Sequence, residues 1–140
     1  MITNAKSDDP RIPLRVLIAD GSDVISEGLT ATLSEQTCIL VVGCANKAIQ
    51  ALALIETVHP DVVLLDLQMP GDSLVSLLHL IKLVKIPPVV IVLTPYASAA
   101  LRERCLNAGA DYVFAKTTEL ESMTNVLEKL VAEKNSSAKK

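Results

Sequence analysis

The chain has 140 residues, which suits one domain whose core can hold the fold together without disulfides or bound metal. Half of the residues are hydrophobic, but the aromatic ones are only two Tyr, one Phe and no Trp, so we expect a core of Leu, Val, Ile and Ala. The formal net charge of −3 gives no indication of nucleic acid or an anionic membrane as a partner.

The two ends of the chain are expected to lie outside the folded domain. Residues 1–12 are polar and predict a flexible arm, and residues 134–140 predict a flexible basic tail. The folded domain is then expected over residues 13–133. The arm has no apolar segment of the kind that a secretory signal needs, and no apolar run reaches the length of a membrane-spanning helix. We therefore expect a cytoplasmic protein without membrane contact.

Five short apolar runs alternate with segments of helical periodicity. Most of the runs are continuous, which is typical of parallel strands buried on both faces. The expected strands are Leu14–Ala19, Ile39–Cys44, Val62–Leu65, Val89–Leu93 and Tyr112–Ala115. This alternation predicts an α/β fold, a (βα)₅ doubly wound parallel sheet of five strands with helices on both faces.

The third expected helix, over residues 73–84, differs from the others. Its main apolar stripe is joined by apolar side chains that lie off it, namely Val75, Leu80 and Leu83. A helix that is apolar nearly all round is usually buried on two sides. If the off-stripe side chains are exposed instead, they form an apolar patch that a protein partner or a second copy would cover.

Four polar residues follow the carboxyl ends of four expected strands. Asp20 follows the first strand, Asp66 the third, Thr94 the fourth and Lys116 the fifth. Because open parallel α/β sheets bind ligands at the carboxyl ends of their strands, we expect these side chains to converge at one edge. A carboxylate there can attack phosphorus and form an acyl phosphate, while an ammonium, a hydroxyl and a divalent cation stabilise charge on the phosphoryl oxygens.

Each of these residues also has a purely structural interpretation. Asp20 would cap the first helix, since acids favour helix N-termini. Asp66 would be a loop carboxylate and Lys116 a surface lysine. Thr94 precedes a proline, a combination that is common in turns.

Four motifs, in order along the chain, resemble the response-regulator receiver family of bacterial two-component systems, including its chemotaxis regulators. The resemblance covers about residues 14–131 and implies the flavodoxin-like receiver fold with strand order 2-1-3-4-5. The motifs are Val16-Leu-Ile-Ala-Asp20, Val62-Val-Leu-Leu-Asp66-Leu-Gln-Met-Pro-Gly71, Val92-Leu-Thr94 and Gly109-Ala-Asp-Tyr-Val-Phe-Ala-Lys116.

The resemblance implies a role for each polar residue. Asp66 would accept a phosphoryl group, Thr94 would hydrogen-bond to that group, and Lys116 would pair with Asp66 or its phosphate. Mg²⁺ would be held by Asp20, Asp66 and the backbone carbonyl of Gln68. The protein would then be a signalling phosphoacceptor and not an enzyme, apart from its own phosphotransfer and autodephosphorylation.

The chain departs from the family pattern at the expected metal site. The family usually has two adjacent acids after the first strand, and the second position is Gly21 in this chain. The cation thereby loses a ligand and a negative charge, so we expect weak Mg²⁺ binding. Asp23 follows at the expected helix start, and whether it replaces the missing acid stays open.

Further departures lie around the fourth and fifth strands. The family's aromatic switch position, three residues before Lys116, is Val113, and alternation would turn Tyr112 to the opposite face. Pro95 stands where a small residue commonly follows the threonine, and Thr117 stands where a proline commonly follows the lysine. These differences argue against the family's usual aromatic-and-threonine switch.

Two functions therefore stay open. In the first, a stand-alone receiver accepts a phosphoryl group on Asp66 from a histidine kinase or phosphotransfer protein. It then signals through protein contacts of the third helix, or of the fourth helix, fifth strand and fifth helix, and a homodimer is one such contact. In the second, a pseudo-receiver acts as an interaction module independent of phosphorylation, which Gly21, Val113 and Pro95 favour.

Other classes of function fit less well. A phosphatase with an aspartate nucleophile needs an acid two residues later, where this chain has Gln68. A flavin binder needs a hydroxyl-rich phosphate loop in place of the acidic Asp20-Gly-Ser-Asp23. The cysteines, Cys38, Cys44 and Cys105, lack metal-ligand spacing and are expected to be reduced, largely buried thiols.

Overall fold

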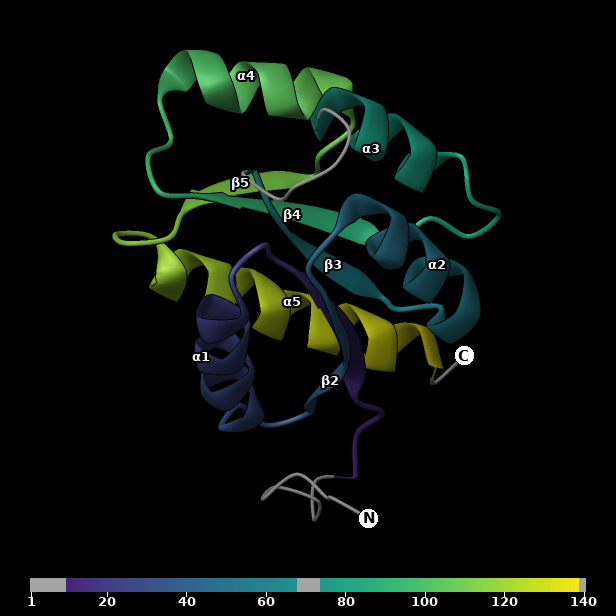
Figure 1. Ribbon diagram of the computed structural model, residues 1–140. Coiled ribbons are helices and arrows are strands. Elements are labelled where there is room, and N and C mark those ends of the chain that lie inside the picture. The colour runs from purple at the N-terminus through teal and green to yellow at the C-terminus, as the bar shows by residue number, and fades with distance from the viewer. Residues whose placement is uncertain (1–9, 68–73, 139–140) are drawn as a thin grey trace.

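Five parallel strands form one sheet in a computed structural model that describes residues 10–67 and 74–138 (Figure 1). The strand order is β2-β1-β3-β4-β5, as the sequence resemblance implied. Each strand begins at its expected residue, and three of them extend one residue further. The bounds are β1 Leu14–Ala19, β2 Ile39–Ala45, β3 Val62–Asp66, β4 Val89–Thr94 and β5 Tyr112–Ala115.

A helix follows each strand, which confirms the (βα)₅ order. The helices are α1 Asp23–Ser34, α2 Ala48–Val58, α3 Leu74–Lys82, α4 Ala99–Ala108 and α5 Leu120–Ala138. Figure 1 shows α2, α3 and α4 on one face of the sheet and α1 and α5 on the other. Two helices start at serines whose side chains accept a backbone N–H of the first turn, Ser22 for α1 and Ser98 for α4.

The two faces of the sheet have separate cores because successive strand residues point to opposite sides. In β1, Leu17 and Ala19 join the cluster beneath α2, α3 and α4. Val16 and Ile18 join the cluster beneath α1 and α5. Both cores consist almost entirely of aliphatic side chains, as the composition predicted.

Helix α3 ends at Lys82, two residues before its expected end, and is not buried on two sides. The stripe of Leu77, Leu78 and Ile81 is buried, in agreement with the periodicity. Leu80 and, just beyond the helix end, Leu83 are exposed, with exposed fractions of 43% and 78%. Leu80 and Leu83 therefore form the exposed apolar patch that was the alternative expectation for this helix. The side chain of Val75 lies outside the described part.

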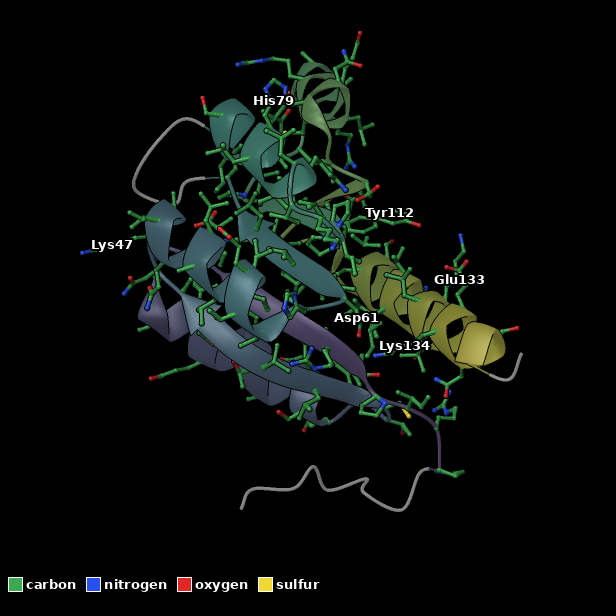
Figure 2. All side chains as sticks on the ribbon, turned by 90° about the vertical axis from the view of Figure 1, so that its right-hand side faces the viewer. Lys47, Asp61, His79, Tyr112, Glu133 and Lys134 are labelled. Atoms are coloured by element: carbon green, nitrogen blue, oxygen red, sulfur yellow. The ribbon has the colours of Figure 1, made fainter. Side chains whose placement is uncertain are left out.

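The expected boundary at residue 133 differs from the structure, because α5 continues to Ala138. Figure 2 shows Lys134 of this helix beside Asp61, and their Nζ and Oδ2 atoms are 2.7 Å apart. Asn135 exchanges two hydrogen bonds with the backbone of Ile12, of 2.7 and 3.0 Å. The final turns of α5 thus anchor the segment before β1.

Within the described ranges, no helix is both long and apolar enough to span a membrane.

Candidate functional site

Asp20, Asp66 and Lys116 come together at the carboxyl edge of the sheet. Asp20 directly follows β1, Asp66 ends β3, and Lys116 directly follows β5. The Lys116 ammonium lies 2.8 Å from Asp20 Oδ2 and 3.2 Å from Asp66 Oδ1. One cation therefore bridges two acids that are 46 residues apart in sequence. The expected convergence is confirmed for these three side chains.

Thr94 ends β4, next to β5 in the sheet. It is buried, and its carbonyl accepts the Lys116 N–H at 2.8 Å. Its hydroxyl donates to the carbonyl of Tyr96 at 3.3 Å, within the loop after β4. The threonine thus lies beside Lys116 on the same edge, and its hydroxyl closes a turn in this conformation.

The site is deeply buried for a group of charges. The exposed fractions of the side chains are 2% for Asp20, 7% for Asp66 and 14% for Lys116. A buried carboxylate without a counter-charge is costly, so Lys116 is the main compensating charge described for this pair. With all three groups ionised, the cluster carries one net negative charge.

Asp20 does not cap α1. The cap is Ser22, whose hydroxyl oxygen accepts the N–H of Ile25 at 3.3 Å. Asp20 Oδ1 accepts the N–H of Ser22 at 2.8 Å, and Oδ2 faces Lys116. The carboxylate thus shapes the turn before the helix with one oxygen and contributes to the site with the other.

The set of metal donors is incomplete among the residues that the structure describes. Gly21 contributes no carboxylate, and no group of three His, Cys, Asp or Glu side chains is arranged to hold a metal ion in this part of the chain. Gln68 and the side chain of Asp23 lie outside the described residues. Asp20 and Asp66 still offer the hard oxygen donors that Mg²⁺ prefers, so the fit to this ion is partial.

The position of the family's aromatic switch is part of the core. Val113 is buried in the cluster beneath α3 and α4. Tyr112, labelled in Figure 2, packs on the other face, as alternation predicted. Its ring stacks on that of Phe114, with the ring centroids 6.1 Å apart. Tyr96 is 79% exposed in the loop after β4. Position 113 therefore provides no aromatic side chain that could move with Thr94.

Two charged residues near the site were missed by the sequence reasoning. Arg102 of α4 forms an ion pair with Glu119, which precedes α5. Arg102 also donates to the carbonyl of Val113 at 2.6 Å, and Glu119 accepts the N–H of Ala115 at 2.9 Å. Nothing in the local sequence indicates this pairing, because it depends on how α4 lies across β5.

The family model of the response regulator receiver domain matches residues 16–128. The chain belongs to the receiver domain family.

Curated relatives of this receiver domain are considerably longer than the chain. A protein-glutamate methylesterase/protein-glutamine glutaminase of Koribacter versatilis is 36% identical over 125 residues, which cover 86% of this chain and 34% of that protein. A protein of the same name from Caulobacter vibrioides is 32% identical over 120 residues, covering 85% and 35%. The chain spans about a third of the length of these relatives.

Solved receiver domains have the same fold. The signal receiver domain of the putative response regulator NarL from Mycobacterium tuberculosis has a TM-score of 0.75 at 26% identity, covering 84% of this chain and 98% of that one. The response regulator domain of Thermotoga maritima CheB has a TM-score of 0.73 at 25% identity, covering 88% and 96%. This receiver domain is therefore one of two-component response regulators.

Proposed function

We propose that this receiver domain accepts a phosphoryl group on Asp66, from a histidine kinase or a phosphotransfer protein. The observation that carries the proposal is the buried Asp66 carboxylate at the end of β3, with the Lys116 ammonium 3.2 Å away. A carboxylate oxygen of Asp66 attacks phosphorus, and the bond from phosphorus to the donor breaks. The product is an acyl phosphate, and the electron pair of the broken bond leaves with the donor.

Lys116 and Thr94 support this reaction from neighbouring strands. The Lys116 ammonium offsets the negative charge that the phosphoryl oxygens bring into a site with little access to water. The Thr94 hydroxyl has to leave the carbonyl of Tyr96 before it can donate to a phosphoryl oxygen. That exchange would move the loop after β4, which leads into α4.

Mg²⁺ would be held by the carboxylates of Asp20 and Asp66, with the carbonyl of Gln68 as a further ligand. When bound, it neutralises charge on the phosphoryl oxygens. Because Gly21 lacks a carboxylate and Lys116 already pairs with both acids, we expect weak binding.

The test is to incubate the protein with acetyl phosphate and MgCl₂ and to measure its intact mass. We expect the mass gain of one phosphoryl group in the wild type and none in Asp66→Asn. Asp61→Asn is the control, since Asp61 is also paired with a lysine but is more exposed and lies outside the site, and this variant should gain the same mass as the wild type. A gain that persists in Asp66→Asn would show that the acceptor is a different residue.

A phosphorylation-independent pseudo-receiver is the second candidate, favoured by Gly21, Val113 and the ion pairs of Lys116 with both acids. It predicts no mass gain at any Mg²⁺ concentration. A Mg²⁺ titration of Gly21→Asp beside the wild type separates the causes. A much higher Mg²⁺ affinity in Gly21→Asp than in the wild type would identify the missing acid as the cause of weak binding. Equal Mg²⁺ affinities in the two proteins would mean that another group already fills its place.

We further propose that output passes through protein contacts, by the α4–β5–α5 face or by α3, in the cytoplasm and without nucleic acid. Catalysis would be limited to phosphotransfer and autodephosphorylation on Asp66. The methylesterase relatives are about three times as long as their matched part, so their named activity is not assigned to this chain.

A second copy of the chain is the proposed partner for the apolar patch at the end of α3. A groove of about 480 Å³ lies between the ends of α2 and α3, and its lining includes the exposed Leu83 and Ile86. Glu56 and Lys85 line the same groove, and neither takes part in the ion pairs found within the described residues. A two-fold arrangement would place the acid of each copy opposite the base of the other.

This contact predicts self-association in sedimentation experiments. Glu56→Lys and Lys85→Glu should each weaken the dimer, and the double reversal should restore it. Ile49→Ser, which removes an exposed apolar side chain that does not line the groove, is the control and should leave association unchanged. A strict monomer at high protein concentration would refute the homodimer.

A further inference from the structure

Two side chains cover the outer edge of β5. This strand ends the sheet, so one side of its backbone has no neighbouring strand. The Val113 carbonyl on that side accepts a hydrogen bond from Arg102 Nη1 at 2.6 Å. The Ala115 N–H donates to Glu119 Oε1 at 2.9 Å. Arg102 Nη2 and Glu119 Oε1 then join in an ion pair across the strand edge.

Glu119 also closes the loop that carries Lys116. Its carboxylate accepts the Ala115 N–H, and its own N–H donates to the Ala115 carbonyl at 3.0 Å. Both backbone groups of Ala115 are thus bonded to the residue four positions later. Lys116 is the first residue inside this loop, and its N–H is held by the Thr94 carbonyl at 2.8 Å.

The Glu119 carboxylate is charged near neutral pH. The Ala115 N–H and the Arg102 guanidinium hold the pKa of Glu119 below its ordinary value. The ion pair is therefore formed under the conditions in which a receiver works.

Helix α4 packs on the sheet most closely through its second half, and in its first half Leu101 is only partly buried against the same core. Its buried residues are Cys105 and Ala108, both in its second half. Arg102 lies in the first turn, which follows the loop after β4 (Figure 1). The bonds from Arg102 to Val113 and Glu119 thus tie the least buried end of α4 to β5 and to the start of α5.

We propose that Arg102 and Glu119 are positioning residues for Lys116 and that they couple α4 to the charge at Asp66. The path runs from Asp66 through Lys116 and its loop to Glu119, Arg102 and α4, and every step is an ion pair, a hydrogen bond or a loop of at most five residues. It needs no aromatic side chain at position 113. Through this coupling, phosphorylation of Asp66 would change the position of α4. The coupling, unlike the positioning of Lys116, therefore rests on the proposed function.

Substitutions separate the two parts of the inference. Glu119→Gln keeps an oxygen for the Ala115 N–H and removes the charge that faces Arg102. Glu119→Ala removes both, and Arg102→Ala removes the link from α4. Lys82→Ala is the matched control, since Lys82 and Asp111 form an ion pair of similar exposure, 29% and 40%, away from the site.

The positioning role is tested by amide hydrogen exchange in the unphosphorylated protein. Exchange at the Lys116 N–H, which reports its bond to Thr94, should be faster in Glu119→Ala and close to wild type in Glu119→Gln. Lys82→Ala should leave it unchanged. Equal exchange in Glu119→Ala and the wild type would overturn the positioning role.

The coupling is tested by NMR, with Asp66→Asn as the change of charge at the site. In the wild-type background, Asp66→Asn should shift the amide resonances of Lys116 and of α4. With Arg102→Ala or Glu119→Gln, the Lys116 shift should persist and the α4 shifts should fall by half or more, whereas Lys82→Ala should retain both. An α4 response of equal size with and without Arg102, or no α4 response at all, would overturn the coupling. Failure of the proposed phosphorylation is distinguishable, because it shows as a missing mass gain with acetyl phosphate and not in these spectra.

Discussion

Lys116→Met should be among the most destabilising single substitutions at the site. Methionine keeps much of the length of the side chain and removes the ammonium, which leaves two buried carboxylates without their shared cation. The net charge of the cluster changes from one negative unit to two. The substitution therefore tests directly whether Lys116 stabilises the folded state.

The expected cost follows from the distances and the burial. At separations of 2.8 and 3.2 Å and an effective dielectric constant of about 20, each contact is worth at most roughly 5 to 6 kcal/mol. Desolvation of the three groups offsets much of this, and removal of one partner of a buried pair costs about 3–5 kcal/mol. Because Lys116 keeps 14% exposure, we expect about 3 kcal/mol, or a melting temperature lowered by roughly 10 °C.

Urea unfolding followed by far-UV circular dichroism measures this cost, since the chain has no Trp. Lys82→Met breaks an ion pair exposed to 29% and 40% and should cost less than about 1 kcal/mol. Adding Asp20→Asn to Lys116→Met should recover part of the loss, because only one carboxylate has then lost its ion pair with Lys116. MgCl₂ should raise the melting temperature of Lys116→Met more than that of the wild type. A Lys116→Met protein no less stable than Lys82→Met would refute this account of the site.

Three further predictions concern other parts of the chain. Gly109→Ala should lower the free energy of unfolding by about 1–2 kcal/mol in the same urea assay, because Gly109 ends α4 with φ of 120°. Glu119 has a pKa lowered by hydrogen bonds from a backbone N–H and a guanidinium, so its stabilising effect is present above its ordinary pKa and is lost as the pH falls through the lowered one. Acid unfolding curves of Glu119→Gln should accordingly show a shallower loss of stability, and an unchanged slope would count against this pairing. The exposed Cys44 should react with a thiol reagent in the native protein. Cys38 and Cys105 are buried and should react only on unfolding. Burial also raises the pKa of the Cys105 thiol, which slows its reaction further.

The pattern of the sequence by itself predicted a (βα)₅ fold, and the family resemblance added the strand order. Continuous apolar runs such as Val62–Leu65 are buried on both faces, and a parallel sheet covered by helices on both sides provides such positions. Because connections in such sheets are short and right-handed, the alternation of strands and helices left few topologies. The convergence of Asp20, Asp66 and Lys116 followed from the same rule, since each comes at the end of a parallel strand.

Contacts between distant segments were decided only by the tertiary structure. The sequence could not show that one ammonium bridges both acids, nor that Ser22 caps α1 and leaves Asp20 for the site. The exposure of Cys44 and the anchoring of Ile12 by Asn135 depend equally on neighbours far away in sequence.

The Arg102–Glu119 pair shows the physical reason for this division. Periodicity along the chain reports which face of an element is apolar, because burial of apolar area follows local spacing. A salt bridge between charged side chains depends on the angle and height at which two elements pack, and those are set by the whole core. The apolar pattern therefore determined the class of fold and the edge at which the site lies, and the packed structure determined which charges meet there.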